Sequence, residues 1–294
     1  MKRGTPHNAM TVDVEDYFQV SAFEAHVDRD SWARTAPRVE ANVERILDLF
    51  DRHAVQGTFF TLGWIAERHP DVVRRIVAAG HELASHGWDH TRVTELTPDA
   101  FREDVGRTRT LLEDVGGVSV IGYRAPSYSI NAGNLWAHEL LAETGYAYSS
   151  SIAPLRHDLY GMPEAPRFPF MSAGGRLQEI PVTTVPVAGR NINVGGGGWF
   201  RLYPYAFSRW ALRRVNERDG ESAHFYFHPW EIDPAQPRID GVGLKTRVRH
   251  YLNLGRMEQR LERLLADFSW GRMDEVFGLR TCQRQREGAA ESAA

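Results

Sequence analysis

The sequence predicts an α/β protein, a single domain in which a parallel sheet closes into a distorted (β/α) barrel with helices outside. Segments with strand-like and helix-like patterns alternate along the chain, as they do when a crossover helix follows each parallel strand. The length of 294 residues suits one barrel. No linker or internal repeat divides the chain.

In the first half, the helix-like segments carry start and stop signals. Pro70 and Pro98 stand in first helical turns, Thr97 is placed to cap the second of these helices, and Gly80 ends the first. The strand at 57–63 is rich in aromatic and β-branched residues between glycines. We therefore expect strands at 9–16, 57–63, 81–87 and 118–126, and helices at 39–53, 70–80, 97–117 and 132–145.

The second half continues the alternation, with strands expected at 146–152, 177–187 and 223–231 and helices at 203–220 and 246–268. Four glycines at 195–198 lie between them. A phosphate-binding loop would need a strand-G-x-G-x-x-G-helix context or a following Lys-Ser/Thr, and neither is present. We interpret this run as a mobile loop.

The expected organisation has four parts. Residues 1–9 form a flexible lead, 10–232 the barrel, 233–280 a helical C-terminal extension that packs on the barrel, and 281–294 a small, polar, disordered tail. The N-terminus lacks the apolar stretch of a secretory signal, and no run of 18 apolar residues could span a bilayer. A cytoplasmic location is the expectation.

Composition narrows the classes of function. The net charge of −3 argues against binding to nucleic acid, because no surplus of cations exists to neutralise phosphates. Cys282 is the single cysteine, so no disulfide can form within the chain. Eight tryptophans and ten tyrosines are typical of saccharide-binding proteins, although core packing accounts for most such rings. The composition is compatible with either a monomer or an oligomer.

Polar side chains stand at the ends of four expected strands. Each has a structural explanation alone, such as a helix cap, a core histidine or a surface ion pair. In a parallel barrel, however, the C-terminal strand ends meet at one rim, where active sites lie. One site at that rim explains them together: Asp13, Glu15, Asp16, His86, His90, Arg124 and His228.

The chain contains two pairs of histidines four residues apart. His86 and His90 flank a Gly-Trp that ends a strand, and their spacing lets two imidazoles share a metal ion. His224 and His228 lie on one strand and would be about 13 Å apart, at roughly 3.3 Å per residue. They cannot share an ion, so we expect His224 to be buried at the bottom of the barrel and His228 to reach the rim.

The stretches "TVDVED", "TFFTLG", "GHELASHGWDH", "YRAPSYS" and "FHPWE" occur in this order over residues 10–232. Together they resemble the polysaccharide deacetylase family, the carbohydrate esterases related to nodulation chitooligosaccharide deacetylases (NodB homology). "DVEDYF", "GRN" at 189–191, "GGGGWFRLYPY" and "HPWEIDPAQP" resemble a bacterial subgroup found with exopolysaccharide and exosortase loci. The resemblance implies a distorted barrel and metal-dependent removal of N-acetyl groups from a glycan.

The resemblance also implies roles for the residues at the rim. His86, His90 and one acid would bind a divalent metal, expected to be zinc, with cobalt, nickel or manganese as alternatives. We prefer Glu15 as the acid, with Asp16 as the alternative. Asp13 would be the general base, held ionised by Arg124, and His228 the general acid. The acetylated glycan would contact Trp88, Ser127, Tyr128 and Trp230, with a backbone N–H near Ser127 assisting the oxyanion.

Some motifs depart from the family pattern. Most members read Thr-Phe-Asp-Asp in the first motif, and many read Asp-Ser-Ser where this chain has Ser149, Ser150 and Ser151. The partner that orients His228 therefore remains unidentified. Alternatives to a deacetylase are an allantoinase-like hydrolase of small cyclic amides and a non-catalytic glycan-binding module. A metal-dependent sugar isomerase is a weaker alternative, because it would need more carboxylate ligands at strand ends than this sequence offers.

Overall fold

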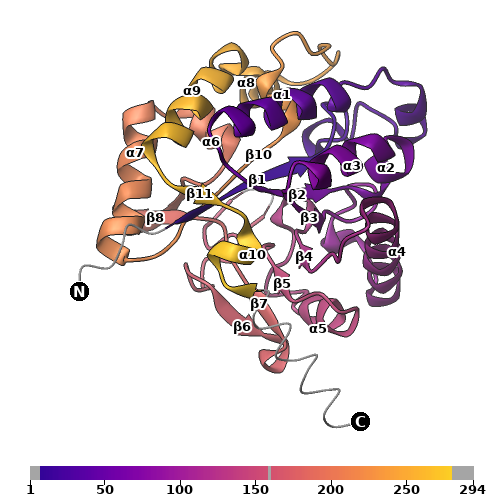
Figure 1. Cartoon of the computed structure of the whole chain (residues 1–294), viewed down its shortest axis with the longest axis horizontal. Coiled ribbons are helices and arrows are strands. Elements are labelled where there is room, and N and C mark those ends of the chain that lie inside the picture. Colours follow the sequence, from indigo (N-terminus) through magenta and orange to yellow (C-terminus); the bar gives the residue numbers. More distant parts are fainter. Residues whose placement is uncertain (1–6, 158–159, 280–294) are drawn as a thin grey trace.

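The computed structural model describes residues 7–157 and 160–279, which form a curled, barrel-like sheet surrounded by helices (Figure 1). The described strands of the main sheet follow the order β10-β1-β2-β3-β4-β5-β7-β6, and β11 also pairs with β1. All pairs are parallel except β6 with β7. The α/β class and the distorted barrel are thus confirmed. The strands are β1 (Asn8–Val14), β2 (Thr58–Thr61), β3 (Glu82–Ser85), β4 (Gly122–Tyr123), β5 (Tyr148–Ser149), β6 (Phe170–Ser172), β7 (Leu177–Glu179), β10 (His224–Phe227) and β11 (Trp270–Gly271).

Helices follow the strands as the alternation predicts. They are α1 (Val39–Arg52), α2 (Gly63–Arg68), α3 (Pro70–Ala78), α4 (Pro98–Gly116), α5 (Trp136–Glu143), α6 (Gly197–Leu202), α7 (Tyr205–Arg213), α8 (Leu244–Tyr251), α9 (Leu254–Asp267) and α10 (Met273–Val276). Short 3₁₀ turns include η4 (Pro126–Tyr128) and η7 (Pro229–Ile232), and a π-helical turn, η6 (Arg214–Asp219), extends α7. No helix in the described part of the chain combines the length and apolar character needed to cross a bilayer.

Local chemistry explains where the predicted helices begin and end. Pro70 and Pro98 occupy the first turns of α3 and α4, and the Thr97 hydroxyl accepts a hydrogen bond from the Ala100 amide at 3.3 Å. Gly117 ends α4 in a left-handed conformation with φ of 65°. These signals lie within a few residues of the ends, so the sequence located both helices closely.

The expectation for the glycine run at 195–198 is wrong. Gly195 is buried beside β10, and its carbonyl accepts a hydrogen bond from the Tyr226 amide at 2.7 Å. A Cβ on Gly195 would lie 2.6 Å from the His224 carbonyl oxygen, so the close approach requires glycine. The run thus lies along β10, where Gly196 forms a parallel bridge with Tyr226, and α6 begins within it at Gly197. The expected strand at 177–187 is also divided, because β8 (Thr184–Val187) pairs with β9 (Arg190–Asn193) in a separate hairpin.

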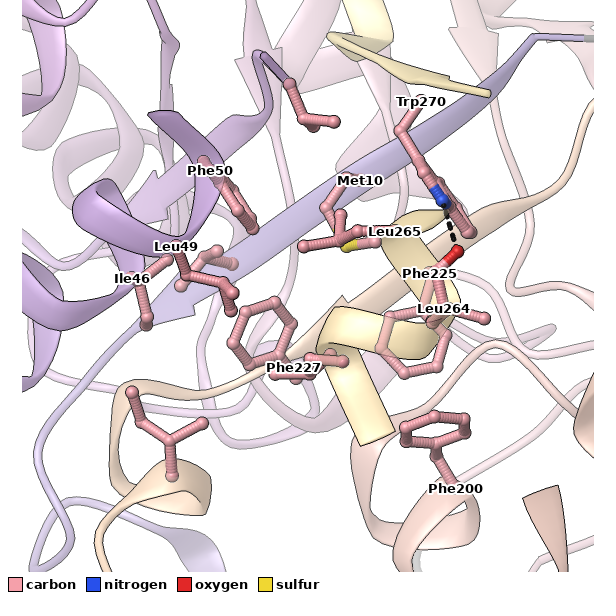
Figure 2. Packing of buried hydrophobic residues seen from close by; sticks show 14 of the residues in the cluster. Met10, Ile46, Leu49, Phe50, Phe200, Phe225, Phe227, Leu264, Leu265 and Trp270 are labelled. Atoms are coloured by element: carbon pink, nitrogen blue, oxygen red, sulfur yellow. Dashed lines mark hydrogen bonds between the residues drawn. The ribbon is translucent and has the colours of Figure 1, made fainter. Parts of the chain in front are cut away.

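The largest cluster of buried apolar side chains lies between the sheet and the helices that cover it (Figure 2). Side chains of β1 and β10 contact side chains of α1 and α9, and the Trp270 indole donates a hydrogen bond to the Leu264 carbonyl at 3.0 Å. This packing fixes β1 and β10, whose C-terminal ends carry polar residues. The labelled members are Met10, Ile46, Leu49, Phe50, Phe200, Phe225, Phe227, Leu264, Leu265 and Trp270.

The C-terminal part of the chain joins the sheet itself. The helix expected at 246–268 is two helices, α8 and α9, because Asn253 between them is left-handed with φ of 55°. Beyond α9, β11 pairs with β1, and the Met273 amide donates to the Thr58 hydroxyl at 2.8 Å. Asn8, in the expected flexible lead, belongs to β1. Residues 1–6 of that lead, the expected tail at 281–294 and Cys282 lie outside the described residues.

Candidate active site

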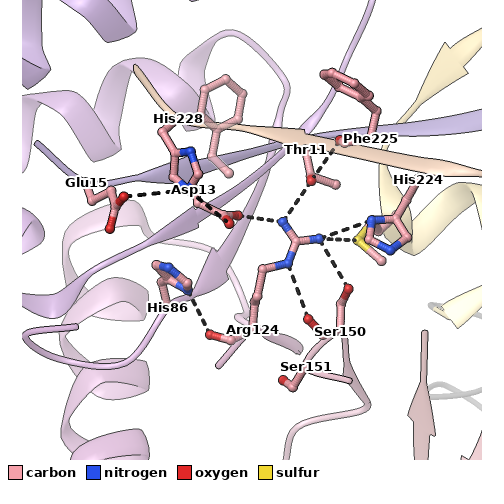
Figure 3. A network of polar contacts seen from close by, with 12 residues as sticks. Thr11, Asp13, Glu15, His86, Arg124, Ser150, Ser151, His224, Phe225 and His228 are labelled. Atoms are coloured by element: carbon pink, nitrogen blue, oxygen red, sulfur yellow. Dashed lines mark hydrogen bonds and ion pairs between the residues drawn. The ribbon is translucent and has the colours of Figure 1, made fainter. Parts of the chain in front are cut away.

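The ends of β1, β3, β4 and β10 bring the predicted polar residues together (Figure 3). Asp13 is the penultimate residue of β1, and Glu15 follows the strand directly. His86 follows β3, Arg124 follows β4 and His228 follows β10. Because these strands are parallel, their C-terminal ends lie at one edge of the sheet, as the rim hypothesis requires.

Glu15, His86 and His90 form a cluster suited to a metal ion. One ligand atom from each residue lies within 4.8 Å of the others, and all three side chains are buried. His86 Nδ1 lies 2.8 Å from the Arg124 carbonyl oxygen, which can only accept, so Nδ1 is the protonated nitrogen and Nε2 keeps its lone pair for a metal. Burial lowers the pKa of His86 to about 4, which keeps the imidazole in the neutral, ligating form.

The Glu15 carboxylate is oriented toward the two imidazoles. Its Oε1 accepts a hydrogen bond from the Trp230 indole at 3.1 Å, and its Oε2 lies 2.9 Å from His90 Nε2. Among the described residues, no side chain other than the nearby His90 offers a partner to this buried oxygen. Burial alone would raise the pKa of Glu15, but the neighbouring His90 and His228 hold it well below its usual value. This buried, ionised oxygen beside two imidazole nitrogens fits a divalent cation.

Asp16, the alternative ligand, points elsewhere. Its Oδ2 accepts hydrogen bonds from the backbone amides of Arg38 and Val39 at 2.6 and 3.0 Å, and Oδ1 accepts from the Tyr17 amide at 2.8 Å. Asp16 thus caps the start of α1, where no local side chain does so. Burial raises the pKa of its carboxyl despite these amides. Of the two acids that the sequence left open, the structure brings Glu15 to the histidines.

Asp13 and Arg124 form a buried ion pair beside this cluster. Arg124 Nη1 donates to Asp13 Oδ1 at 2.5 Å and to the Thr11 hydroxyl at 2.8 Å. The guanidinium is 0% exposed, and its other donors reach the Ser150 hydroxyl at 3.2 Å and lie 3.4 Å from His224 Nδ1. The pair leaves Asp13 Oδ2 facing His228 Nε2 at 3.9 Å. Arg124 therefore fixes the direction in which Asp13 presents its second oxygen.

His224 is buried, as the sequence predicts, and lies inside the barrel at the start of β10. Its Nε2 lies 2.9 Å from the Pro181 carbonyl oxygen, so that nitrogen is the donor and Nδ1 faces the Arg124 guanidinium. Burial first, and then the positive charge of Arg124, lower the pKa of His224 to about 3. A neutral imidazole here accommodates the buried guanidinium.

His228 has an orienting partner that sequence reasoning missed. Its Nδ1 lies 2.6 Å from Glu231 Oε1, and Arg201 Nε donates to Glu231 Oε2 at 2.8 Å. Glu231 and Arg201 are 0% and 1% exposed. Burial would lower the pKa of His228, but Glu15, Glu231 and Asp13 raise it to about 9. The signal for Glu231 was its position three residues after His228 in "HPWE"; nothing in the sequence marked Arg201.

Trp230 lies in a stack of three rings. Its indole is parallel to the imidazole of His228, with centroids 5.0 Å apart, and to that of His250 at 4.1 Å. It is 6% exposed and donates to Glu15. Trp230, which is expected to contact substrate, thus also holds in place Glu15, a candidate metal ligand, and His228, the candidate general acid.

Of the predicted substrate contacts at 127 and 128, Ser127 lies toward His90, and the Tyr128 ring lies beside Tyr226. Ser127 has a left-handed backbone with φ of 54°, and its hydroxyl lies 2.7 Å from that of Ser21, itself 3.5 Å from His90 Nδ1. The Tyr128 amide donates to the Ala125 carbonyl at 3.0 Å, so this N–H is already used. Tyr128 is buried, and its role as a substrate contact stays a prediction.

Trp88 sits between α2 and α4, half-buried. A Cβ on Gly63 would lie 2.5 Å from its ring, and the Arg107 guanidinium lies 4.1 Å from the ring centroid. The Trp88 amide is 3.2 Å from both carboxylate oxygens of Asp104. Asp104 thus holds the turn between His86 and His90, and burial raises its pKa to about 7.

The two imidazoles and the Glu15 carboxylate could hold a divalent cation, and the Asp13–Arg124 pair and His228 place an acceptor and a donor of protons beside them. Comparison with known families agrees. Residues 30–148 match the family model described as polysaccharide deacetylase, and residues 150–278 match a domain of unknown function, DUF3473. The part of the chain at 30–148 is therefore similar to polysaccharide deacetylases. Asp13 and Glu15 precede the first match, and His228 lies in the second.

Sequence relatives carry related names. Peptidoglycan-N-acetylglucosamine deacetylase of Bacillus cereus is 33% identical over 96 residues, which cover 32% of this chain and 35% of that protein. Chitooligosaccharide deacetylase of Rhizobium leguminosarum bv. trifolii is 39% identical over 64 residues, 22% of this chain and 30% of that protein. The chain thus matches about a third of the length of these curated relatives.

Two solved structures share the fold. A polysaccharide deacetylase from Mycobacterium smegmatis superposes with a TM-score of 0.63 at 22% identity and covers 96% of this chain and 93% of its own. Puue allantoinase gives a TM-score of 0.58 at 16% identity and covers 93% and 92%. At these identities the likeness concerns the fold alone.

Proposed function

We propose that this protein is a metal-dependent hydrolase that removes N-acetyl groups from an amino-sugar polysaccharide or oligosaccharide. One observation carries the proposal: Glu15, His86 and His90 converge beside Asp13 and His228 in a chain that is similar to polysaccharide deacetylases. The names of the relatives, which specify peptidoglycan and chitooligosaccharide, support an N-acetylated glycan as substrate.

The cluster of Glu15, His86 and His90 would hold the metal. Two neutral imidazoles and one carboxylate suit zinc, and cobalt, nickel or manganese would accept the same ligands. When bound at such a site, a divalent ion acidifies water and polarises a carbonyl oxygen. Trp230 and the Arg124 carbonyl hold Glu15 and His86 in the ligating orientation.

The chain's own residues supply the proton transfers. Asp13 accepts a proton from the attacking water through Oδ2, because Oδ1 is held by Arg124. His228, protonated because its pKa is raised to about 9, donates from Nε2 to the departing sugar amine. Glu231 accepts the Nδ1–H of His228 and keeps the ring turned toward Asp13.

The biological role proposed is exopolysaccharide biosynthesis. It is supported by the sequence details "DVEDYF", "GRN" and "GGGGWFRLYPY", which resemble the subgroup found at exopolysaccharide loci. The glycine stretch has a structural reason to be retained, since Gly195 lies against His224 and Gly197 against Glu231. The cytoplasmic location stays a prediction.

The test is to load the purified chain with zinc, cobalt or nickel, incubate it with N-acetylated oligosaccharides and measure free acetate. The expected result is acetate release that is lost in Asp13→Asn and His86→Ala, with circular dichroism unchanged. Arg74→Gln, an exposed change on α3, is the matched control. No release from any N-acetylated glycan by a metal-loaded sample would favour a glycan-binding module, and hydrolysis of allantoin instead would favour the allantoinase alternative.

A further inference from the structure

A row of aromatic side chains runs along α6 and α7. The ring centroids of Trp199 and Tyr203 are 5.6 Å apart, those of Tyr203 and Phe207 4.9 Å, and those of Phe207 and Trp210 5.5 Å. We call Trp199, Tyr203, Phe207 and Trp210 the aromatic row. Trp199 is on α6, Tyr203 stands between α6 and α7, and Phe207 and Trp210 are on α7. The contacts between successive rings join them into one row.

The aromatic row reaches a side of α7 that does not pack on the barrel. The buried residues of α7 are Tyr205, Ser208, Ala211 and Leu212. At 100° per residue Trp210 lies on the opposite side of α7, and Phe207 lies at the border between the two sides. Trp210 is 45% exposed, and the other three rings are half-buried, with Phe207 reaching the core. Large rings gathered on an outer helix face are typical of a binding surface.

The aromatic row begins beside the candidate active site. α6 starts at Gly197, where a Cβ would lie 2.5 Å from both carboxylate oxygens of Glu231. Glu231 in turn holds His228. Trp199 stands two residues further along α6, and the row leads from there to Phe207 and Trp210 on α7.

The far end of the aromatic row is rich in arginine. Trp210 lines a surface hollow of about 440 Å³ with Arg209, Arg213, Arg214 and Arg218, together with Ala206 and Glu217. The Arg214 guanidinium lies 5.8 Å from the Trp210 ring centroid. Arg209 is paired with Asp267 at 3.0 Å, whereas the side chains of Arg213 and Arg218 are exposed. Guanidinium groups beside a ring suit carboxylate, sulfate or phosphate groups on a ligand.

We propose that the aromatic row binds the sugar rings of the same glycan chain beyond the residue that is deacetylated, and that this glycan is a polymer carrying negative charge. The inference rests on the proposed function and adds a substrate class to it. Sugar rings have apolar C–H faces that stack on aromatic side chains, and a row of rings suits a linear chain. An exposed Trp and several arginines could also attach a protein to a bilayer. The aromatic row, however, starts beside the candidate active site, which favours a glycan chain as its ligand.

The experiment measures binding of the zinc-loaded chain to hyaluronan, an N-acetylated and anionic polymer, as a tetrasaccharide and as a long chain. Neutral chitin oligosaccharides and phosphatidylglycerol vesicles are the comparison ligands. Long hyaluronan should bind more tightly than the tetrasaccharide, and Trp210→Ala should weaken only the long chain, by about tenfold. The double change Arg213→Gln and Arg218→Gln should reduce the salt dependence of that binding. Leu244→Ala and Arg74→Gln are matched exposed controls on α8 and α3.

Each outcome of this experiment either supports or overturns the proposed glycan-binding role of the aromatic row. Equal binding of short and long hyaluronan, or no effect of Trp210→Ala, overturns the inference, as does binding to vesicles without binding to long hyaluronan. Tighter binding of chitin than of hyaluronan overturns the anionic part. Because binding needs no turnover, a chain that binds long hyaluronan through Trp210 but releases no acetate supports the inference while the proposed function fails.

Discussion

Glu231 Oε1 lies 2.6 Å from Nδ1 of His228, three residues before it in the chain. The second oxygen of Glu231 accepts a hydrogen bond from Arg201 Nε at 2.8 Å. Arg201 also donates hydrogen bonds to the backbone carbonyls of His250 and Leu252, which hold it in place. The histidine proposed to protonate the leaving amine is thus held by a chain of contacts that ends between α8 and α9.

Glu231→Gln should lower kcat for deacetylation by about 10²-fold, the contribution typical of a general acid. Glu231 is one of the groups that raise the pKa of His228 to about 9, so its neutralisation should lower that pKa. Less imidazolium then remains at alkaline pH, and the alkaline limb of the kcat profile should move to lower pH. Glu217→Gln, an exposed change, is the control. An unchanged pH profile would contradict the proposed role of Glu231.

Metal content distinguishes the two acids after β1. Glu15→Gln should weaken zinc binding by at least about 10²-fold, more than most losses of outer partners. Asp16→Ala should leave the zinc stoichiometry intact but lower the free energy of unfolding by about 1–3 kcal/mol, because the amides at the start of α1 lose their acceptor. Elemental analysis after dialysis, with urea unfolding, checks both. Zinc lost from Asp16→Ala and kept by Glu15→Gln would reverse the assignment.

Arg124→Lys should reduce both stability and activity. An ammonium group cannot reach Asp13, Thr11 and Ser150 together as the guanidinium does. Buried acceptors are then left without donors, which should lower the free energy of unfolding by about 1–3 kcal/mol. Arg45→Lys, in an exposed pair with Glu258, should change neither property. Wild-type acetate release by Arg124→Lys would show that the direction of Asp13 does not matter.

Stability should fall as pH rises toward 7 because of Glu82. Burial first, and then the nearby Asp274, raise the pKa of Glu82 from 4.5 to about 7. The folded chain therefore binds this proton between those pH values, and the unfolded chain does not. Its stabilisation is complete below about 4.5 and is lost as pH rises through about 7. Glu82→Gln should flatten this part of the stability profile in urea unfolding, whereas the exposed change Glu67→Gln should preserve it.

The sequence predicted best what depends on local patterns. Strand ends placed His86, Arg124 and His228 at one rim, since parallel strands share direction. The same reasoning could not separate Glu15 from Asp16, because both follow β1 and the distinction depends on the distant amides of α1. It also missed Arg201, whose role depends on contacts with carbonyls about 50 residues away in the chain.

The glycine run and the break at Asn253 show a second limit. Glycines are typical of loops, but Gly195 is needed because another backbone passes close to it. The apolar periodicity of 246–268 continues through Asn253, although the backbone there is left-handed. Both features come from tertiary packing, which no local pattern records.

The pairing of β11 with β1 brings a late segment of the described chain against the first strand. Met273 follows β11; its amide donates to Thr58, and Arg124 Nη2 lies 3.8 Å from its sulfur. During synthesis, the candidate site residues, from Asp13 to His228, leave the ribosome before the segment that contacts Arg124 through Met273. We therefore expect the proposed active site to be complete only after Trp270 and Met273 have emerged, because these residues add the last contacts around β1 and Arg124.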